Sequence, residues 1–175
     1  MEKIITNNFI ILQADISDLE EFKQIEEECN QYFSFDPQCE DNHSVPIKEC
    51  LTTGDLPPGG TKENYYFFGI RQDNELIGFM AYYLGYPEKD IAYLSVLYIG
   101  DRYRKNGIGS EIVNAVVHKL KAIGINEIRL HVSLRNVTAL HFWVKQQFDK
   151  IVKVECTGNL ISSNFAGIEL QRKLS

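Results

Sequence analysis

Two glycines in the second half of the chain, Gly107 and Gly109, have the spacing and surroundings of an anion-binding site. Glycine lets the backbone approach a ligand closely, and the free N–H groups and dipole of a helix's first turn favour a negative charge. The segment consists of Arg104, Lys105, Asn106, Gly107, Ile108, Gly109 and Ser110. It is neither the three-glycine dinucleotide fingerprint nor a Walker A loop, which needs a following Gly-Lys-Ser/Thr. We expect it to bind a phosphate group; the alternative is a tight turn with no ligand.

The stretches on either side of this loop predict the elements that hold it. Residues 91–99 are rich in β-branched and aromatic side chains, which is typical of a buried strand. After the loop, apolar residues recur at helical spacing up to a stop signal at Gly124. These residues are Ile108, Ile112, Val113, Val116, Val117, Leu120 and Ile123. The loop is therefore expected to join the end of a strand to the start of a helix.

The loop resembles the signature of the GNAT acyltransferase superfamily, Gln/Arg-x-x-Gly-x-Gly/Ala, through Arg104, Gly107 and Gly109. A second family element follows a predicted strand at 127–133 and resembles the pattern Asn-x-x-Ala-x-x-Phe-Tyr-x-x-x-Gly-Phe. The matching residues are Asn136, Ala139, Phe142 and Phe148. Two motifs in the family's order are much more specific than either motif alone.

This resemblance implies an α/β fold with a mixed central β-sheet of about seven strands flanked by helices. It also implies acetyl-coenzyme A as co-substrate and no metal. In such proteins the loop amides bind the cofactor's pyrophosphate, a role that falls on residues 104–110. The strand before the loop lends backbone N–H groups to the thioester carbonyl and the pantetheine arm. The residues at those positions are Leu97, Tyr98 and Ile99. Asn136 and Trp143 are further candidates for cofactor contact, and Asn136 is also suited to cap its helix.

Acetyl transfer to an amine sets two demands on such a site. An amine with a pKa of about 10 is protonated at neutral pH, so a base or a water chain must first remove a proton. The coenzyme A thiolate, whose pKa is close to the ~8.5 of a cysteine thiol, leaves without much help. Alignment of the reactants and N–H donation to the developing oxyanion are therefore expected to contribute most.

The sequence departs from the family where its catalytic side chains usually lie. Trp143 stands where many relatives carry a tyrosine that protonates the sulfur, and an indole N–H has no useful acidity. Tyr93 stands where some relatives carry a glutamate base, and Gln147 replaces a glycine, which predicts an altered turn. Our candidates for catalysis are Tyr93, Tyr98 and Ser133, the last near the end of its strand. Because side chains alternate, Tyr98 faces either the acceptor channel or the opposite layer.

The other patterns predict the remaining elements. A strand at 9–12 precedes a helix that starts near Ser17, with Glu20 at the N3 position of a capping box. A short helix at 47–51, a loop at 54–60 and a hairpin around Asp73 and Asn74 follow. The hairpin strands are expected at 65–71 and 76–84, a helix at 136–147, and final strands at 151–156 and 165–172. Helices lie between the strands only in part, so the sheet should be mixed.

Composition is that of an ordinary globular protein, 44% hydrophobic and 24% charged. A chain of 175 residues buries roughly 70% of its unfolded surface, so we expect a single domain over 1–175. The net charge of −6 argues against nucleic acid as a partner, since a phosphate backbone requires clustered cations. The first residues lack a signal peptide's apolar run and no stretch is long enough to cross a bilayer. We therefore expect a cytoplasmic protein with no membrane partner.

The four cysteines show no CxxC spacing, and a reducing compartment disfavours disulfides. They are Cys29, Cys39, Cys50 and Cys156. We expect buried or neutral thiols with no metal or redox role.

Acidic residues gather near the N-terminus, with Lys23 as their one cationic neighbour in sequence. They are Glu20, Glu21, Glu26, Glu27, Glu28, Asp36, Glu40 and Asp41. On the helix most lie opposite the apolar stripe, which is typical of a solvated face. In the superfamily this helix and the following loop line the acceptor site. The resemblance therefore makes a cationic amine a candidate acceptor, with neutral amines, amino acids and peptide N-termini still open.

These observations predict an N-acetyltransferase that moves an acetyl group from acetyl-coenzyme A to a primary amine of a small molecule or peptide by direct attack. Because the family's tyrosine is missing, a catalytically weakened coenzyme A-binding sensor or interaction protein is an alternative. A nucleotide-binding domain unrelated to acyl transfer is a third reading. The sequence leaves open the acceptor, the acyl chain length and the oligomeric state, including a homodimer.

Overall fold

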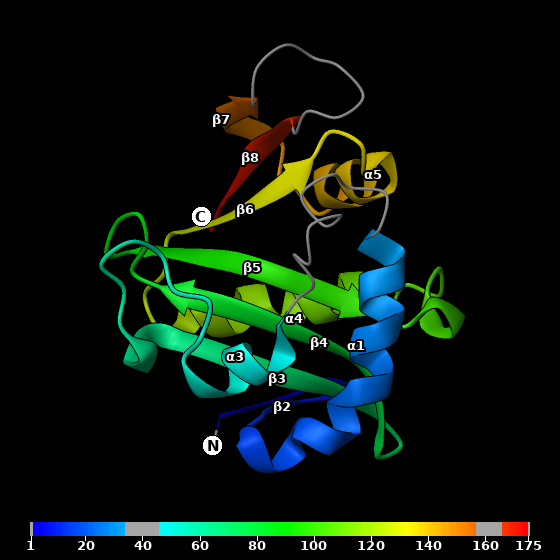
Figure 1. The fold of residues 1–175 in the computed structure, drawn as a ribbon. Coiled ribbons are helices and arrows are strands. Elements are labelled where there is room, and N and C mark those ends of the chain that lie inside the picture. The colour runs from blue at the N-terminus through cyan, green and yellow to red at the C-terminus, as the bar shows by residue number, and fades with distance from the viewer. Residues whose placement is uncertain (1, 34–45, 157–165, 175) are drawn as a thin grey trace.

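A computed structural model describes residues 2–33, 46–156 and 166–174 of the chain. These residues form one eight-stranded sheet in the order β1-β2-β3-β4-β5-β6-β8-β7 (Figure 1). The strands are β1 (Lys3–Ile5), β2 (Ile10–Gln13), β3 (Tyr65–Gln72), β4 (Glu75–Leu84), β5 (Ile91–Ile99), β6 (Glu127–Ser133), β7 (Lys150–Cys156) and β8 (Ala166–Lys173). The helices are α1 (Leu19–Phe33), α3 (Ile47–Thr52), α4 (Ile108–Ala122) and α5 (Val137–Lys145), with short 3-10 turns η1 (Ile16–Asp18), η2 (Lys62–Asn64) and η3 (Asp101–Tyr103).

Each of the first five strands pairs antiparallel with the next, and the sequence predicted the turn between β3 and β4. Asp73 and Asn74 connect β3 to β4, and both adopt positive φ, 49° and 69°. Asp and Asn tolerate this left-handed conformation better than most residues, and such a two-residue turn matches the twist of the strands it joins. The hairpin prediction is confirmed.

The sheet is mixed because β5 and β6 run parallel, joined by the crossover helix α4. Their pairing covers only three register pairs, the last being Tyr93 with Arg129. Beyond it the register of β5 against β4 shifts at Ser95, an extra residue that forms a bulge. The far halves of β5 and β6 therefore border a gap between the two arms of the sheet. The short strand β1 makes the sheet eight-stranded where about seven strands were expected.

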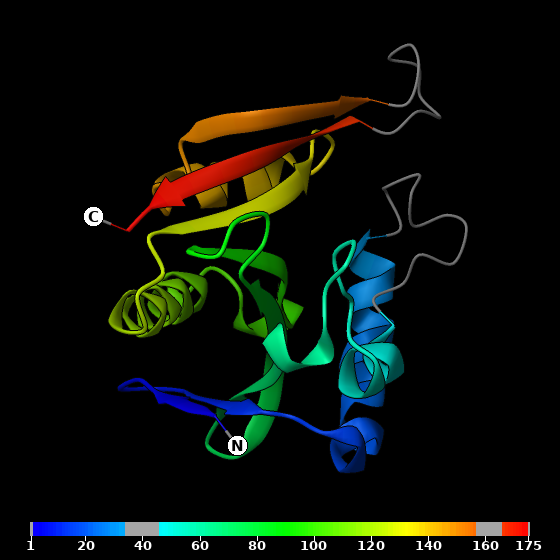
Figure 2. The ribbon, with the colours of Figure 1, turned by 90° about the vertical axis from the view of Figure 1, so that its left-hand side faces the viewer.

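Helices cover both faces of the sheet, so the molecule has two apolar layers. Helices α4 and α5 lie on one face and α1 and α3 on the other (Figure 2). The buried side of α4 is the predicted stripe, with Ile112, Val113, Val116 and Leu120 packed onto the sheet. The layer under α1 centres on Phe22, which is fully buried between the rings of Phe67 and Phe79.

The start of the first helix differs from its prediction. Asp15, not Ser17, caps it: the Asp15 carboxylate accepts from the backbone N–H of Ser17, and the Asp18 carboxylate accepts from the backbone N–H of Asp15. The capping box therefore lies two residues earlier and opens a 3-10 turn that leads into α1. Both residue sets fit the capping pattern, and sequence alone does not separate overlapping boxes. Within the described part of the chain, no helix is long and apolar enough to span a bilayer.

Candidate functional site

The predicted phosphate loop follows the end of β5, beyond the point at Tyr93 where the strand parts from β6. The turn η3 and two residues with positive φ, Lys105 at 69° and Gly107 at 79°, lead into α4. Gly107 occupies the N-cap of that helix, and no side chain caps it. A Cβ atom added to Gly107 would meet nothing within 4 Å, so the space beside the loop is open. The N–H groups of the first turn are thus available to an anion.

The second glycine of the motif serves a different purpose. A Cβ atom on Gly109 would lie 3.0 Å from two ring carbons of Phe142, so α4 and α5 approach each other closely there. Ser110 lies one residue further, and its hydroxyl accepts a 2.9 Å hydrogen bond from the Gln146 side chain of α5. Gly107 therefore shapes the loop, whereas Gly109 lets the two helices pack beside it.

The backbone of β5 turns polar groups into the gap. The N–H of Gly100 donates to the carbonyl of Ile77, so these two residues form a hydrogen-bonded pair. This bond shows which residue pairs of the antiparallel β4–β5 ladder are hydrogen-bonded and which are not. Bonded and non-bonded pairs alternate, so Leu97 and Ile99 direct their N–H and C=O groups away from β4. The Ile99 carbonyl indeed accepts a bond from Arg104 Nε at 2.7 Å. The Leu97 N–H therefore faces the gap, as donation to a thioester carbonyl would require.

The sequence left open which face of the sheet the Tyr98 side chain occupies. In the structure it lies in the layer under α1, and not in the layer under α4 and α5. It is 2% exposed, stacks on Phe79, and donates to Glu28 Oε1 at 3.0 Å. Burial and the bond to Glu28 raise the pKa of Tyr98 well above its usual range. The N–H and C=O groups of Tyr98, which lies between Leu97 and Ile99, point toward β4, so neither its side chain nor its backbone polar groups enter the gap.

Tyr93 lies where β5 and β6 separate and faces the same layer, with its ring 5.6 Å from that of Tyr86. Burial, followed by the nearby carboxylates of Glu169 and Glu155, raises the pKa of Tyr93 strongly. A phenol in this state keeps its proton at neutral pH. Tyr93 is therefore unsuited to act as a base, and its phenol is also a weaker acid than a free tyrosine.

Polar side chains line the α1-side face of β6 and its neighbours. Ser133 ends β6 and its hydroxyl accepts from the Arg135 N–H at 3.4 Å. His131, two residues earlier, lies 3.6 Å from the carboxylate of Glu155, and Arg129 forms an ion pair with Glu169 at 3.3 Å. Beyond the point where β5 leaves, Ser133 and His131 border the gap from its β6 side.

The second family motif is placed on α5 and its ends. Asn136 is buried and its side-chain oxygen accepts from the Ala139 N–H at 3.0 Å, so the predicted helix cap is confirmed. Trp143 is 8% exposed and packs edge-to-face against Phe142 and Phe148 in the core. Gln147 takes a φ of 67°, so this residue adopts the left-handed conformation that glycine favours.

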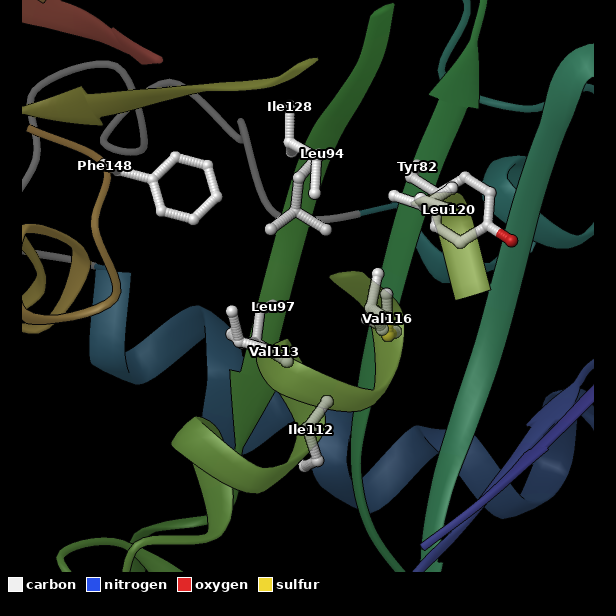
Figure 3. Close-up of a pocket in the computed structure, with 10 residues that line it drawn as sticks. Tyr82, Leu94, Leu97, Ile112, Val113, Val116, Leu120, Ile128 and Phe148 are labelled. Atoms are coloured by element: carbon white, nitrogen blue, oxygen red, sulfur yellow. The ribbon is translucent and has the colours of Figure 1, made fainter. Parts of the chain in front are cut away.

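Two hollows lie near the sheet, one on each of its faces. A small apolar pocket of about 10 Å³, roughly one water in size, lies between α4 and the sheet (Figure 3). Leu94, Ile128 and Phe148 lie at one end of it, and Tyr82 and Leu120 at the other. A larger hollow of about 360 Å³ lies between α1 and the start of β4, with Glu21, Glu28, Glu75 and Arg102 in its wall. Neither coincides with the open space beside Gly107.

The acidic face of α1 is more engaged than the sequence indicated. Glu21 forms an ion pair with Arg71, Glu26 accepts from the Ile47 N–H at 3.0 Å, and Glu28 holds Tyr98. Asp36, Glu40 and Asp41 lie outside the described residues, as does Cys39. Cys29 and Cys50 are buried thiols, and Cys156 is an exposed one. Among the residues that the structure describes, no cluster of three His, Cys, Asp or Glu side chains is arranged to hold a metal.

Comparison with known proteins identifies what this arrangement is similar to. The sequence model of the acetyltransferase (GNAT) family matches residues 19–148. A search of curated proteins for similar sequences found no match.

Solved structures share the fold at low sequence identity. A probable acetyltransferase from Staphylococcus epidermidis superposes with a TM-score of 0.72 at 16% identity, over 95% of this chain and 99% of the other. The PaiA N-acetyltransferase from Thermoplasma acidophilum, solved in complex with coenzyme A, gives 0.64 at 22% identity, over 94% and 98%. The ribosomal-protein-S18-alanine N-acetyltransferase from Escherichia coli gives 0.64 at 16% identity, over 95% and 94%.

Proposed function

Because the chain belongs to the acetyltransferase (GNAT) family, we propose that it transfers an acetyl group from acetyl-coenzyme A to a primary amine by direct attack. Family membership supports acyl transfer with coenzyme A. The observation that supports the cofactor's position is the uncapped start of α4 beside open space at Gly107. The sensor alternative is not favoured, because the matching family and the similar solved structures are acetyltransferases.

In the proposed reaction the neutral amine nitrogen attacks the thioester carbon, a C–N bond forms, and the C–S bond breaks to release the thiolate. The Leu97 N–H, turned into the gap, is the donor we assign to the oxyanion. The amine must lose one proton, and the thiolate gains one to leave as the thiol. The raised pKa of Tyr93 excludes it as the base of the first transfer and makes it a weak acid for the second, so we assign the proton of the thiol to solvent. For the first we retain Ser133, acting through water, as the candidate on the opposite side of the gap.

The acceptor we propose is a small-molecule or peptide amine, and a cationic one is the first to test. Acidic side chains on α1 and on the β6–β8–β7 face lie on the acceptor side of the sheet. Arg71 and Arg129 neutralise part of this charge, so neutral amines belong in the same screen.

The experiment is a thiol-release screen with acetyl-coenzyme A over polyamines, aminoglycosides, amino acids and peptides. We expect one acceptor class to release free thiol well above background hydrolysis. Gly107→Val is the matched negative variant, because a β-branched residue is strained at a φ of 79° and fills the space for phosphate. It should weaken coenzyme A binding by more than about 100-fold, or 2.7 kcal/mol, in calorimetry. Equal affinity in both proteins would remove the loop from the mechanism.

A further inference from the structure

Arg104, the first residue of the loop motif, points away from the open space beside Gly107. Its guanidinium lies 4.0 Å from the ring centre of Tyr32 and 4.9 Å from that of Tyr98. Nε binds the Ile99 carbonyl, and Nη1 pairs with Asp101 at 2.5 Å. The side chain is only 26% exposed. Arg104 therefore connects the loop to the layer under α1, with aromatic faces stabilising its charge.

Helix α1 holds the same region through Glu28. The Oε1 atom of Glu28 accepts from the Tyr98 hydroxyl at 3.0 Å and from the Asp101 N–H at 2.6 Å. One carboxylate thus binds both the side chain of Tyr98 on β5 and the backbone of Asp101, the first residue of η3. Bonds to an ionised acceptor are among the stronger ones in proteins.

Tyr32 lies one helical turn after Glu28 and reaches both arms of the divided sheet. Its ring supports Arg104 on the β5 arm and meets Tyr98 edge-to-face at 6.0 Å. Its hydroxyl donates to Asn136 Oδ1 at 3.5 Å, and Asn136 caps α5 on the β6 arm. One side chain of α1 therefore spans the gap where β5 and β6 no longer pair.

We propose that Tyr32 is a positioning residue, which holds Arg104 and thereby sets the loop that binds the cofactor. The proposal rests on the proposed function, since it needs coenzyme A to bind at that loop. Loss of the Tyr32 ring removes the nearer of the two aromatic faces from the guanidinium, so Arg104 holds the loop less firmly and part of the loop's order must be supplied when the ligand binds. The cost of ordering appears in cofactor affinity, because a loop that is not preorganised binds more weakly.

The test measures the dissociation constant of coenzyme A by calorimetry in single and double variants. We expect Tyr32→Leu to weaken binding about tenfold, which is 1.4 kcal/mol. Tyr32→Phe keeps the ring and loses only the long bond to Asn136, so it should change affinity less than about threefold. In an Arg104→Gln background, Tyr32→Leu should have little further effect, because both changes remove the same contact.

Tyr66→Leu is the matched control for a merely structural loss. Tyr66 is also a partly buried tyrosine in an aromatic cluster. It lies on β3 in the layer under α4 and α5, on the other side of the sheet from Tyr32, and contacts Phe68 and Tyr82. It should lower the urea midpoint as Tyr32→Leu does while leaving coenzyme A affinity unchanged. Unchanged affinity in Tyr32→Leu, with binding still lost in Gly107→Val, would overturn this inference and leave the proposed function intact. Fully additive effects of Tyr32→Leu and Arg104→Gln would also overturn it.

Discussion

The starts of α4 and α5 flank the same gap and treat their unpaired N–H groups in opposite ways. Asn136 caps α5 with its own side chain. Helix α4 begins at Gly107, which has no side chain and leaves the first turn uncapped. Every helix start has several N–H groups that need an acceptor. Of these two starts, only that of α5 receives a side-chain acceptor from the chain. The difference separates a structural helix start from one suited to an anionic ligand.

The largest expected effect is on the free energy of unfolding that coenzyme A adds by capping α4, as we propose. At 100 times its dissociation constant, a ligand that binds only the folded state adds about 2.7 kcal/mol to the free energy of unfolding. We expect Gly107→Asn to remove most of that gain, because its side chain enters the open space. Asparagine tolerates positive φ, so stability without ligand should change by less than about 0.5 kcal/mol. Urea unfolding with and without coenzyme A measures both quantities, and an undiminished gain in Gly107→Asn would contradict the comparison.

A change at the capped start of α5 should have the reverse pattern, lowering stability while leaving coenzyme A affinity nearly unchanged. Asn136→Ala removes the acceptor of the Ala139 N–H and should lower the free energy of unfolding by about 1 kcal/mol. Coenzyme A affinity should change less than about threefold, since a side chain committed to a cap contributes little to the ligand. Asn136→Asp, which preserves the cap, is the control. A larger loss of affinity than of stability would show that Asn136 acts mainly on the cofactor.

Effects of up to about 1 kcal/mol are expected at the other ends of the same two helices. Helix α4 is followed by Gly124 at a φ of 89°, and α5 by Gln147 at 67°. Gln147→Gly should therefore raise the free energy of unfolding by about 0.5–1 kcal/mol, and Gly124→Gln should lower it by about 1 kcal/mol. Thermal unfolding of the two variants checks the signs. Equal signs would mean that the backbone conformation does not govern these termini.

The sequence predicted the elements well where periodicity and turn chemistry agree. Helix α4, strand β6 and the hairpin at Asp73 and Asn74 were predicted almost to the residue. The altered turn expected at Gln147 is not seen in the backbone of that residue, because glutamine there adopts the left-handed conformation that glycine favours. Such a conformation depends on tertiary packing, which one residue type does not reveal.

The site was predicted only in part, because its contacts join segments far apart in the chain. The loop followed from local spacing, whereas Glu28 and Tyr32 were missed as its supports. Their one available signal was their spacing of four residues on α1 beside the buried Cys29. The direction of the Arg104 side chain had no signal in the sequence. Its aromatic partners lie on β5 and on α1, and only the fold brings them together.

The three register pairs between β5 and β6 also bear on how the molecule opens. So short a pairing provides few backbone hydrogen bonds between the two sides of the sheet. The two sides are therefore held together mostly by the packed side chains under α4 and α5. Amide exchange is therefore expected to divide the strands into two cooperative units, β1 to β5 and β6 to β8. A molecule bound in the gap would contact both units at once. Its arrival should slow exchange on both sides together, as an added strand would.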